Sequence, residues 1–196
     1  MSSAGADATT GARSAAARDV DAAVGMTILL GAWVMLFAAL FLAYGVVRVQ
    51  ASEWPPFGAP RLPLLVPGIN TLLLLASSGV LRRGLTRARR GDAGSLLPAT
   101  VVATLLGLAF IGAQIASWRS MLARGLFPSS GVYGSVFYAL TGFHALHVVG
   151  GVVALALLAV QTARGRTTLR ALRLTAIYWD FVAIVWVAMY VAVYWL

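Results

Sequence analysis

Three side chains that could do chemistry lie inside long apolar runs of the sequence: His144, His147 and Asp180. Polar groups inside a membrane are costly and need partners, so each marks a candidate site. His144 and His147 are three residues apart, which places both imidazoles on one face of a helix. A metal site would need at least one more strong ligand, and Asp180 is the only acid inside these runs. We therefore expect an internal polar core formed by these three residues.

The chemistry of this core has one structural interpretation and two functional alternatives. The favoured interpretation is hydrogen bonding between helices, with Asp180 bound to a histidine of the fourth apolar run, because an unpaired carboxylate there would protonate or cost several kcal/mol. A membrane cytochrome or metalloenzyme would use His144 and His147 as ligands, although histidines one turn apart cannot bind opposite faces of one haem. A small proton- or ion-coupled transporter would use Asp180, although no paired, Gly- or Pro-broken spans appear in the sequence.

Composition indicates that the elements holding these residues are membrane helices. The 196 residues are 60% hydrophobic and only 11% charged, which is too little polar surface for a water-soluble globule. A bilayer core about 30 Å thick needs ~20 apolar residues in a helix. Five runs near that length predict an all-α, five-transmembrane-helix bundle over residues 24–196, preceded by a mobile cytoplasmic tail at residues 1–23. The predicted spans are about 24–47, 62–81, 97–118, 132–161 and 172–196.

The distribution of positive charge predicts the orientation. All 15 basic residues are Arg, and eleven of them fall in the tail, the second loop and the fourth loop. Cytoplasmic loops carry the excess of cations, so the N-terminus is expected inside and the C-terminus outside. Because the arginines lie between apolar runs, we expect them to meet lipid headgroups and do not expect nucleic acid as a partner. The second loop is taken to begin at Arg82 and Arg83.

Other residues are expected to make contacts between helices or with lipid. The polar, aromatic and basic candidates are Asn70, Ser77, Gln114, Thr141, Tyr178, Trp179, Arg82 and Arg83. Small residues are expected to permit close helix packing, namely Gly107, Gly112, Gly142, Gly150 and Gly151. The sequence contains no phosphate-cradling loop, paired catalytic carboxylates or H-E-x-x-H motif. We therefore expect no catalytic, cofactor-binding or metal-binding residue in this chain.

One stretch resembles a known family. The run Tyr133 to Val148, which contains the element T-G-F-H-x-x-H-V, resembles the signature of subunit III of haem-copper oxidases (cytochrome c oxidase). Further stretches resemble the five-helix bacterial form of that family in the same order, so that the resemblance covers about residues 25–196. They are Gly25-Met26 with residues 37–44, Trp54-Pro55-Pro56 with residues 67–78, residues 107–114, and Tyr178 to Val182 with Val185-Trp186.

The resemblance implies an accessory subunit that performs no chemistry of its own. Such a subunit packs on subunit I, and with subunit II, of a terminal oxidase that reduces oxygen to water in aerobic electron transport. Haem and copper lie in those partners, and the electron donor is a cytochrome c or a quinol. Subunit III binds phospholipid and supports proton uptake and stable turnover. The implied location is the bacterial cytoplasmic membrane, as a multi-pass protein, with a larger respiratory supercomplex as a further partner.

The sequence departs from the family at four ionisable positions. Trp33 and Ser117 stand where the family commonly has glutamate, Asp180 stands at its histidine, and Ala183 stands at its aspartate. Two fewer glutamates in a low-dielectric core need less balancing charge. We expect these changes to leave a simpler arrangement of His144, His147 and Asp180.

Overall fold

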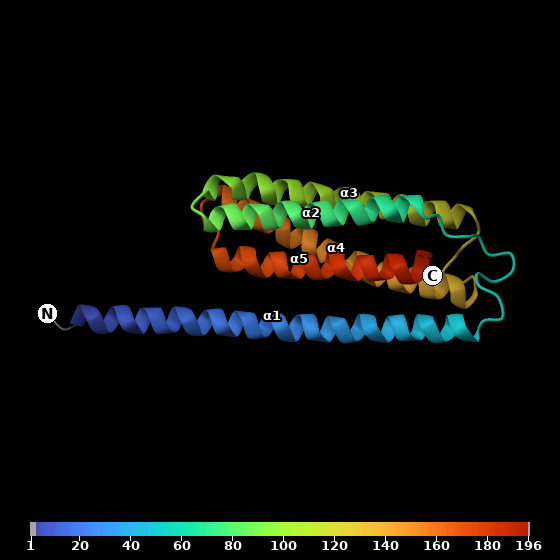
Figure 1. Cartoon of the computed structure of the whole chain (residues 1–196), viewed down its shortest axis with the longest axis horizontal. Helices are drawn as coiled ribbons and strands as arrows, with labels where there is room; N and C mark the ends of the chain where they lie inside the picture. Colours follow the sequence, from blue (N-terminus) through green and yellow to red (C-terminus); the bar gives the residue numbers. More distant parts are fainter. Residues whose placement is uncertain (1–2, 196) are drawn as a thin grey trace. The chain divides into compact units, whose positions relative to one another are not determined.

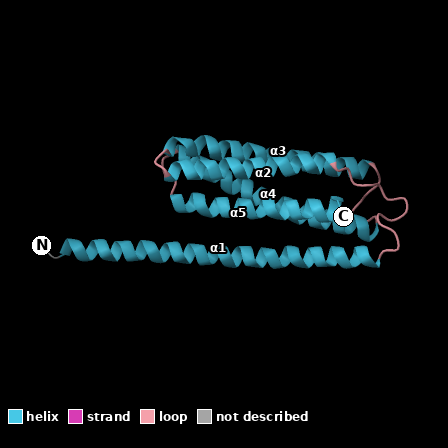
Figure 2. Cartoon of the chain, in the orientation of Figure 1, coloured by secondary structure: helices cyan, strands magenta, loops and turns pink. Residues whose placement is uncertain are grey.

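Five long helices make up most of the chain. The computed structural model describes the backbone of residues 3–195 and the side chains of residues 20–195. The helices are α1 (Ser3–Gln50), α2 (Leu65–Arg89), α3 (Leu96–Ala123), α4 (Gly131–Ala163) and α5 (Leu169–Met189). A 3₁₀ turn, Ala93–Ser95, precedes α3, and a π-helical turn, Tyr190–Trp195, follows α5. Figure 2 shows helices joined by loops, with no strand among the described residues.

Each of the five helices is long and apolar enough to cross a membrane. This confirms the prediction of an all-α protein with five spans. The chain divides into two compact units, one ending at Leu36 and one comprising Phe37–Leu196, and α1 belongs to both. The backbone of α1 is helical from Ser3 onward, through most of the segment that composition predicts to be a tail. The mobility of residues 1–23 stays a prediction.

In the second unit, α2 to α5 lie side by side and alternate in direction (Figure 1). The α2–α3 and α4–α5 connections lie at one end of this bundle, whereas the α1–α2 and α3–α4 connections and the C-terminal end of α5 lie at the other. The two arginine-rich loops therefore share one end, as the charge count requires. We call this the arginine-rich end; that it faces the cytoplasm remains a prediction.

The C-terminal part of α2 differs from the prediction. The sequence places the second span at 62–81 and the following arginines in a loop, but α2 continues to Arg89, so that Arg82, Arg83 and Arg87 are helical. Arg, Leu and Ala favour helix even where the apolar run has ended. The helix stops at Gly91, whose φ of 97° suits glycine, and the N–H of Asp92 donates to the Arg87 carbonyl oxygen in a Schellman motif.

Aromatic rings from several helices fill the core of the second unit. Trp179, Trp186, Phe110 and Phe137 are fully buried and come from α5, α3 and α4. Many large apolar side chains of the same helices are instead exposed, as on a surface that faces lipid or a partner. Leucines such as Leu74, Leu140 and Leu155 are buried together with these rings, so the core combines aromatic and aliphatic side chains.

Candidate functional site

Asp180 is bound by α2. Its Oδ2 lies 2.6 Å from Nη2 of Arg82, and its Oδ1 accepts a hydrogen bond from the Ser78 hydroxyl. Ser78 and Arg82 are four residues apart and lie on the same face of α2, which is why both reach one carboxylate. The sequence predicts a histidine of the fourth span as the partner of Asp180, but the structure engages both carboxylate oxygens from α2. The cause is the extension of α2, which carries Arg82 one turn beyond Ser78.

The neighbouring residue, Trp179, joins four helices. Its side chain is fully buried, and its Nε1–H donates to the Ser77 hydroxyl oxygen of α2 at 2.9 Å. The Ser77 hydroxyl in turn donates to the Ala103 carbonyl oxygen of α3 at 2.9 Å. The indole ring fits against Gly151 of α4 and Gly107 of α3, where added β-carbons would lie 2.5 Å and 3.0 Å from ring atoms. Two of the predicted close-packing glycines are thus confirmed, and their role is to admit this indole.

The other predicted glycines behave differently. A β-carbon at Gly150 would make an ordinary 3.4 Å contact with the Tyr178 hydroxyl. Gly112 and Gly142 have no atom within 4 Å of such a β-carbon in the described part of the chain. Close packing inside the second unit therefore does not explain these last two glycines.

His144 lies in an aromatic enclosure. Its ring is fully buried, with centroid distances of 5.2 Å to Trp186, 5.9 Å to Phe110 and 6.3 Å to Phe37. Neither of its ring nitrogens has a hydrogen-bond partner within the described residues. This imidazole therefore acts as a packed ring in the bundle.

His147 contacts the backbone of its own helix and the ring of Phe37. Its Nδ1 lies 2.6 Å from the Phe143 carbonyl oxygen, one turn earlier, and its ring centroid lies 5.1 Å from that of Phe37. The backbone carbonyl oxygen of His147 also accepts a hydrogen bond from the Tyr178 hydroxyl at 2.8 Å, which joins α4 to α5. Both histidine rings thus contact Phe37, whereas Asp180 is bound by Ser78 and Arg82.

The remaining predicted contacts join the helices nearer the other end of the bundle. Asn70 Nδ2 donates to Gln114 Oε1 at 3.2 Å and links α2 to α3. Thr141 accepts from Trp118 Nε1 at 3.1 Å and links α4 to α3. Three further polar groups are buried without a hydrogen-bond partner among residues 20–195: the Asn70 Oδ1, the Gln114 Nε2 and the Ser117 hydroxyl.

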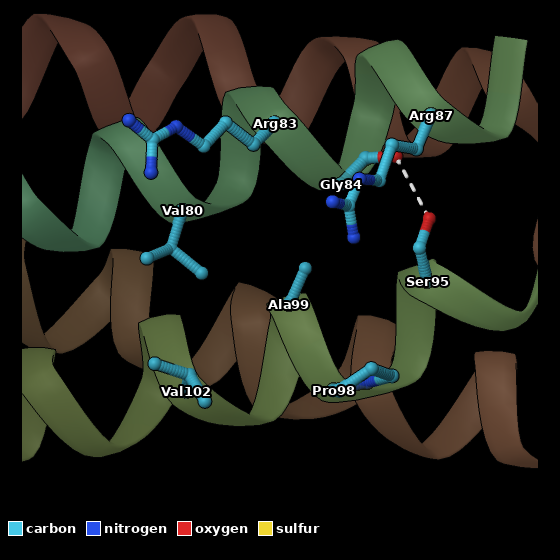
Figure 3. A pocket seen from close by; sticks show the side chains of 8 residues that line it. All are labelled: Val80, Arg83, Gly84, Arg87, Ser95, Pro98, Ala99 and Val102. Carbon is cyan, nitrogen blue, oxygen red and sulfur yellow. Dashed lines mark hydrogen bonds between the residues drawn. The ribbon is translucent and has the colours of Figure 1, made fainter. Parts of the chain in front are cut away.

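Sequence reasoning missed several participants. Trp186 Nε1 donates to the Thr71 hydroxyl at 3.0 Å, and neither of these residues is among those predicted to join helices. Ser78 is expected to hydrogen-bond within its helix or to a neighbour, and its partner in the structure is Asp180. Arg83 is a predicted contact residue, and it lines a groove between α2 and α3 together with Arg87 (Figure 3). The different contacts of Arg82 and Arg83 could have been predicted from helical spacing, because positions 78 and 82 share one face of α2 while positions 83 and 87 share another.

The arrangement offers no site built for a metal ion. No group of three or more His, Cys, Asp or Glu side chains lies together within the described part of the chain. The polar side chains of the core instead join α2 to α3 and α5, and α4 to α3 and α5, through hydrogen bonds and one ion pair. This arrangement can fix the register of the helices.

Comparisons with known proteins agree with the resemblance. Residues 6–196 match the family described as cytochrome c oxidase subunit III. A probable cytochrome c oxidase subunit 3 of Mycobacterium bovis is 39% identical over 175 residues, which cover 87% of this chain and 86% of that protein. The cytochrome c oxidase subunit 3 of Synechocystis is 32% identical over 174 residues, covering 87% of this chain and 73% of that one. That of Corynebacterium diphtheriae is 30% identical over 177 residues, covering 87% and 86%.

Proposed function

The chain belongs to the cytochrome c oxidase subunit III family, and we propose that it is the non-catalytic third subunit of a respiratory haem-copper oxidase in a bacterial cytoplasmic membrane. The observation that carries this proposal is the match over nearly the whole chain, residues 6–196. The oxidase partners, subunits I and II, would hold the haem and copper and reduce oxygen. The chain itself would supply a scaffold of five spans.

The outer faces of the helices support lateral packing on those partners and on lipid. Leu72 of α2 is 67% exposed and Leu105 of α3 is 59% exposed, although both lie in membrane-spanning segments. In a membrane such faces are covered by lipid tails or by other helices. The association of one membrane helix with another depends on close packing and on interhelical hydrogen bonds. Phospholipid would fill the part of this surface that subunits I and II leave open.

Support for proton uptake would be indirect. Asp180 is the only acid in the interior of a span, and its carboxylate is already held by Arg82 and Ser78. Both of its carboxylate oxygens are thus engaged in contacts between α5 and α2. We therefore assign Asp180 to positioning α5 against α2, so that the chain would support proton uptake by holding its partner and lipid in place.

The same ion pair weighs against a proton- or ion-coupled transporter. A coupling site must release its proton or cation during each cycle, and the positive charge of Arg82 competes with a cation for Asp180. The transporter alternative has no other acid on which to rely inside the spans.

The test is purification of the chain from its native membrane in mild detergent. We expect a multi-span, haem-bearing subunit to accompany it, with a reduced-minus-oxidised haem spectrum and oxygen-reducing activity, and with companions identified by mass spectrometry. Deleting the chain should leave an oxidase that begins to turn over but loses activity sooner. A chain that purifies alone and colourless would contradict the proposal, and proton- or ion-coupled uptake would then be measured with Asp180→Asn as the control.

A further inference from the structure

A groove runs between the last turns of α2 and the first turns of α3, at the arginine-rich end of the bundle. Its volume is about 320 Å³. The two helices touch at its floor, where a β-carbon on Gly84 would lie 2.4 Å from Cβ of Ala99. Ser95 closes one end, and its hydroxyl lies 3.5 Å from the Gly84 carbonyl oxygen (Figure 3). The contact at Gly84 fixes the spacing of the helices and therefore the width of the groove.

Two guanidinium groups lie along the α2 wall of this groove. Arg83 and Arg87 are four residues apart on one helix face, and both side chains run back along α2, so that the Arg83 guanidinium lies beside Val80 and the Arg87 guanidinium beside Gly84 (Figure 3). Neither arginine has an ion-pair or hydrogen-bond partner among residues 20–195, whereas Arg82 is neutralised by Asp180. The groove thus offers positive charge for which the described residues supply no counter-ion.

The rest of the groove is apolar. Val80 on α2 and Pro98 and Val102 on α3 line it, and Val102 is 41% exposed. Both helices belong to candidate membrane spans, so this apolar wall continues from the end of the bundle toward the interior of the membrane. A free inorganic anion would use the arginines alone and leave these side chains exposed. A ligand with a negative head and an apolar tail would use both parts.

We infer that the groove between α2 and α3 binds one anionic phospholipid, with its phosphate held by Arg83 and Arg87 and an acyl chain lying against Val80 and Val102. Guanidinium groups suit phosphate because they combine permanent charge with several donors. Besides these two arginines, the stretch 82–95 contains four charged residues, of which only Asp92 is acidic, so the local field favours an anion. This inference rests on the lipid binding proposed above and assigns it a location and a headgroup class.

The experiment uses the full chain together with whatever subunits accompany it from its native membrane. After mild delipidation, phosphatidylglycerol, phosphatidylcholine or inorganic phosphate is added, and bound lipid is counted by native mass spectrometry. We expect saturable binding of one phosphatidylglycerol that is about thirtyfold weaker in Arg83→Gln/Arg87→Gln, since each arginine contributes on the order of 1 kcal/mol to anionic lipid binding. Arg89→Gln/Arg90→Gln, at the same end but outside the groove, is the matched control and should bind as the native chain does.

The inference would be overturned if both double substitutions weakened phosphatidylglycerol binding equally. It would also be overturned if millimolar inorganic phosphate displaced the bound phosphatidylglycerol. If the Arg83→Gln/Arg87→Gln protein fails to fold, Val102→Phe takes its place, because it fills the apolar part and keeps both arginines. Its control is Val101→Phe, which is equally exposed but does not line the groove. Unchanged lipid binding by Val102→Phe would also overturn the inference. The oxidase function is tested separately, by the subunits that co-purify with the chain. The lipid site in the groove can therefore be disproved without affecting the proposed oxidase function, and the reverse also holds.

Discussion

Gly151 of α4 lies directly against the indole of Trp179 on α5: a β-carbon at position 151 would come within 2.5 Å of ring atoms Cε3 and Cζ3. The same indole packs against Gly107 of α3 and donates to the Ser77 hydroxyl of α2. Close approach through glycine is the common way in which membrane helices gain packing energy, because lipid tails supply no hydrophobic driving force. Trp179 is therefore the residue on which the mutual positions of α2, α3, α4 and α5 depend most directly.

Gly151→Ala should destabilise the bundle by about 1–3 kcal/mol, as overpacking of a close contact does. The new methyl group would force the rigid indole of Trp179 away from Gly107 and Ser77. Gly142→Ala is the matched control on the same helix, since no atom of the described residues lies within 4 Å of its added carbon. Unfolding of the purified full chain in mixed detergent micelles gives both free energies. Equal stability of the two variants would contradict this account of Trp179.

The ion pair between Arg82 and Asp180 should contribute a coupling energy of about 0.5–1 kcal/mol. The value is modest because the Arg82 side chain is 66% exposed, although that of Asp180 is only 12% exposed. A double-mutant cycle with Arg82→Gln and Asp180→Asn measures it. Arg83→Gln is the matched control, because it removes a neighbouring arginine that has no carboxylate partner in the described residues. Strict additivity of the two substitutions would show that the pair contributes nothing.

The spans could be predicted from hydropathy, but the end of α2 could not. The length of an apolar run indicates where a helix leaves the hydrocarbon. The helix itself continues until a residue with a non-helical backbone conformation stops it, here Gly91. The prediction therefore stopped at residue 81 and placed Arg82 in a loop. Residues that follow an apolar run can still be helical, and Arg82 shows that their side chains can then reach back into the bundle.

The residues of the polar core could also be predicted, but their partners could not. Polar type inside a span identifies Asp180, Ser77 and His144 from the sequence alone. Which side chain each one meets depends on the rotation of two helices about their axes, and no single-sequence pattern specifies that rotation. The predicted partner of Asp180 is a histidine of the fourth span, whereas in the structure Ser78 and Arg82 of α2 bind this carboxylate. His144 is packed among aromatic rings instead.

Ser117→Glu should disturb the core, because it restores a family carboxylate where its hydroxyl is now buried without a partner within the described residues. A charged group in that position would cost several kcal/mol or force the helices apart. Ser117→Gln adds the same bulk without charge and is the matched control. Thermal stability and oxidase turnover are measured at several pH values. The Glu variant should approach the Gln variant as the pH falls, since protonation removes the charge; identical behaviour at neutral pH would contradict the prediction.

His144→Phe should keep the stability of the chain within about 1 kcal/mol, because volume-conserving swaps in a core are tolerated. The imidazole meets Phe37, Phe110 and Trp186 as a ring, and its nitrogens make no hydrogen bond among residues 20–195. His144→Ala should instead cost about 3 kcal/mol or more, since it leaves a cavity of aromatic size. Chemical unfolding of the full chain distinguishes the two variants, and metal analysis with an absorption spectrum accompanies it. If His144 were a metal or haem ligand, the Phe variant would lose that metal or absorption band and as much stability as the Ala variant.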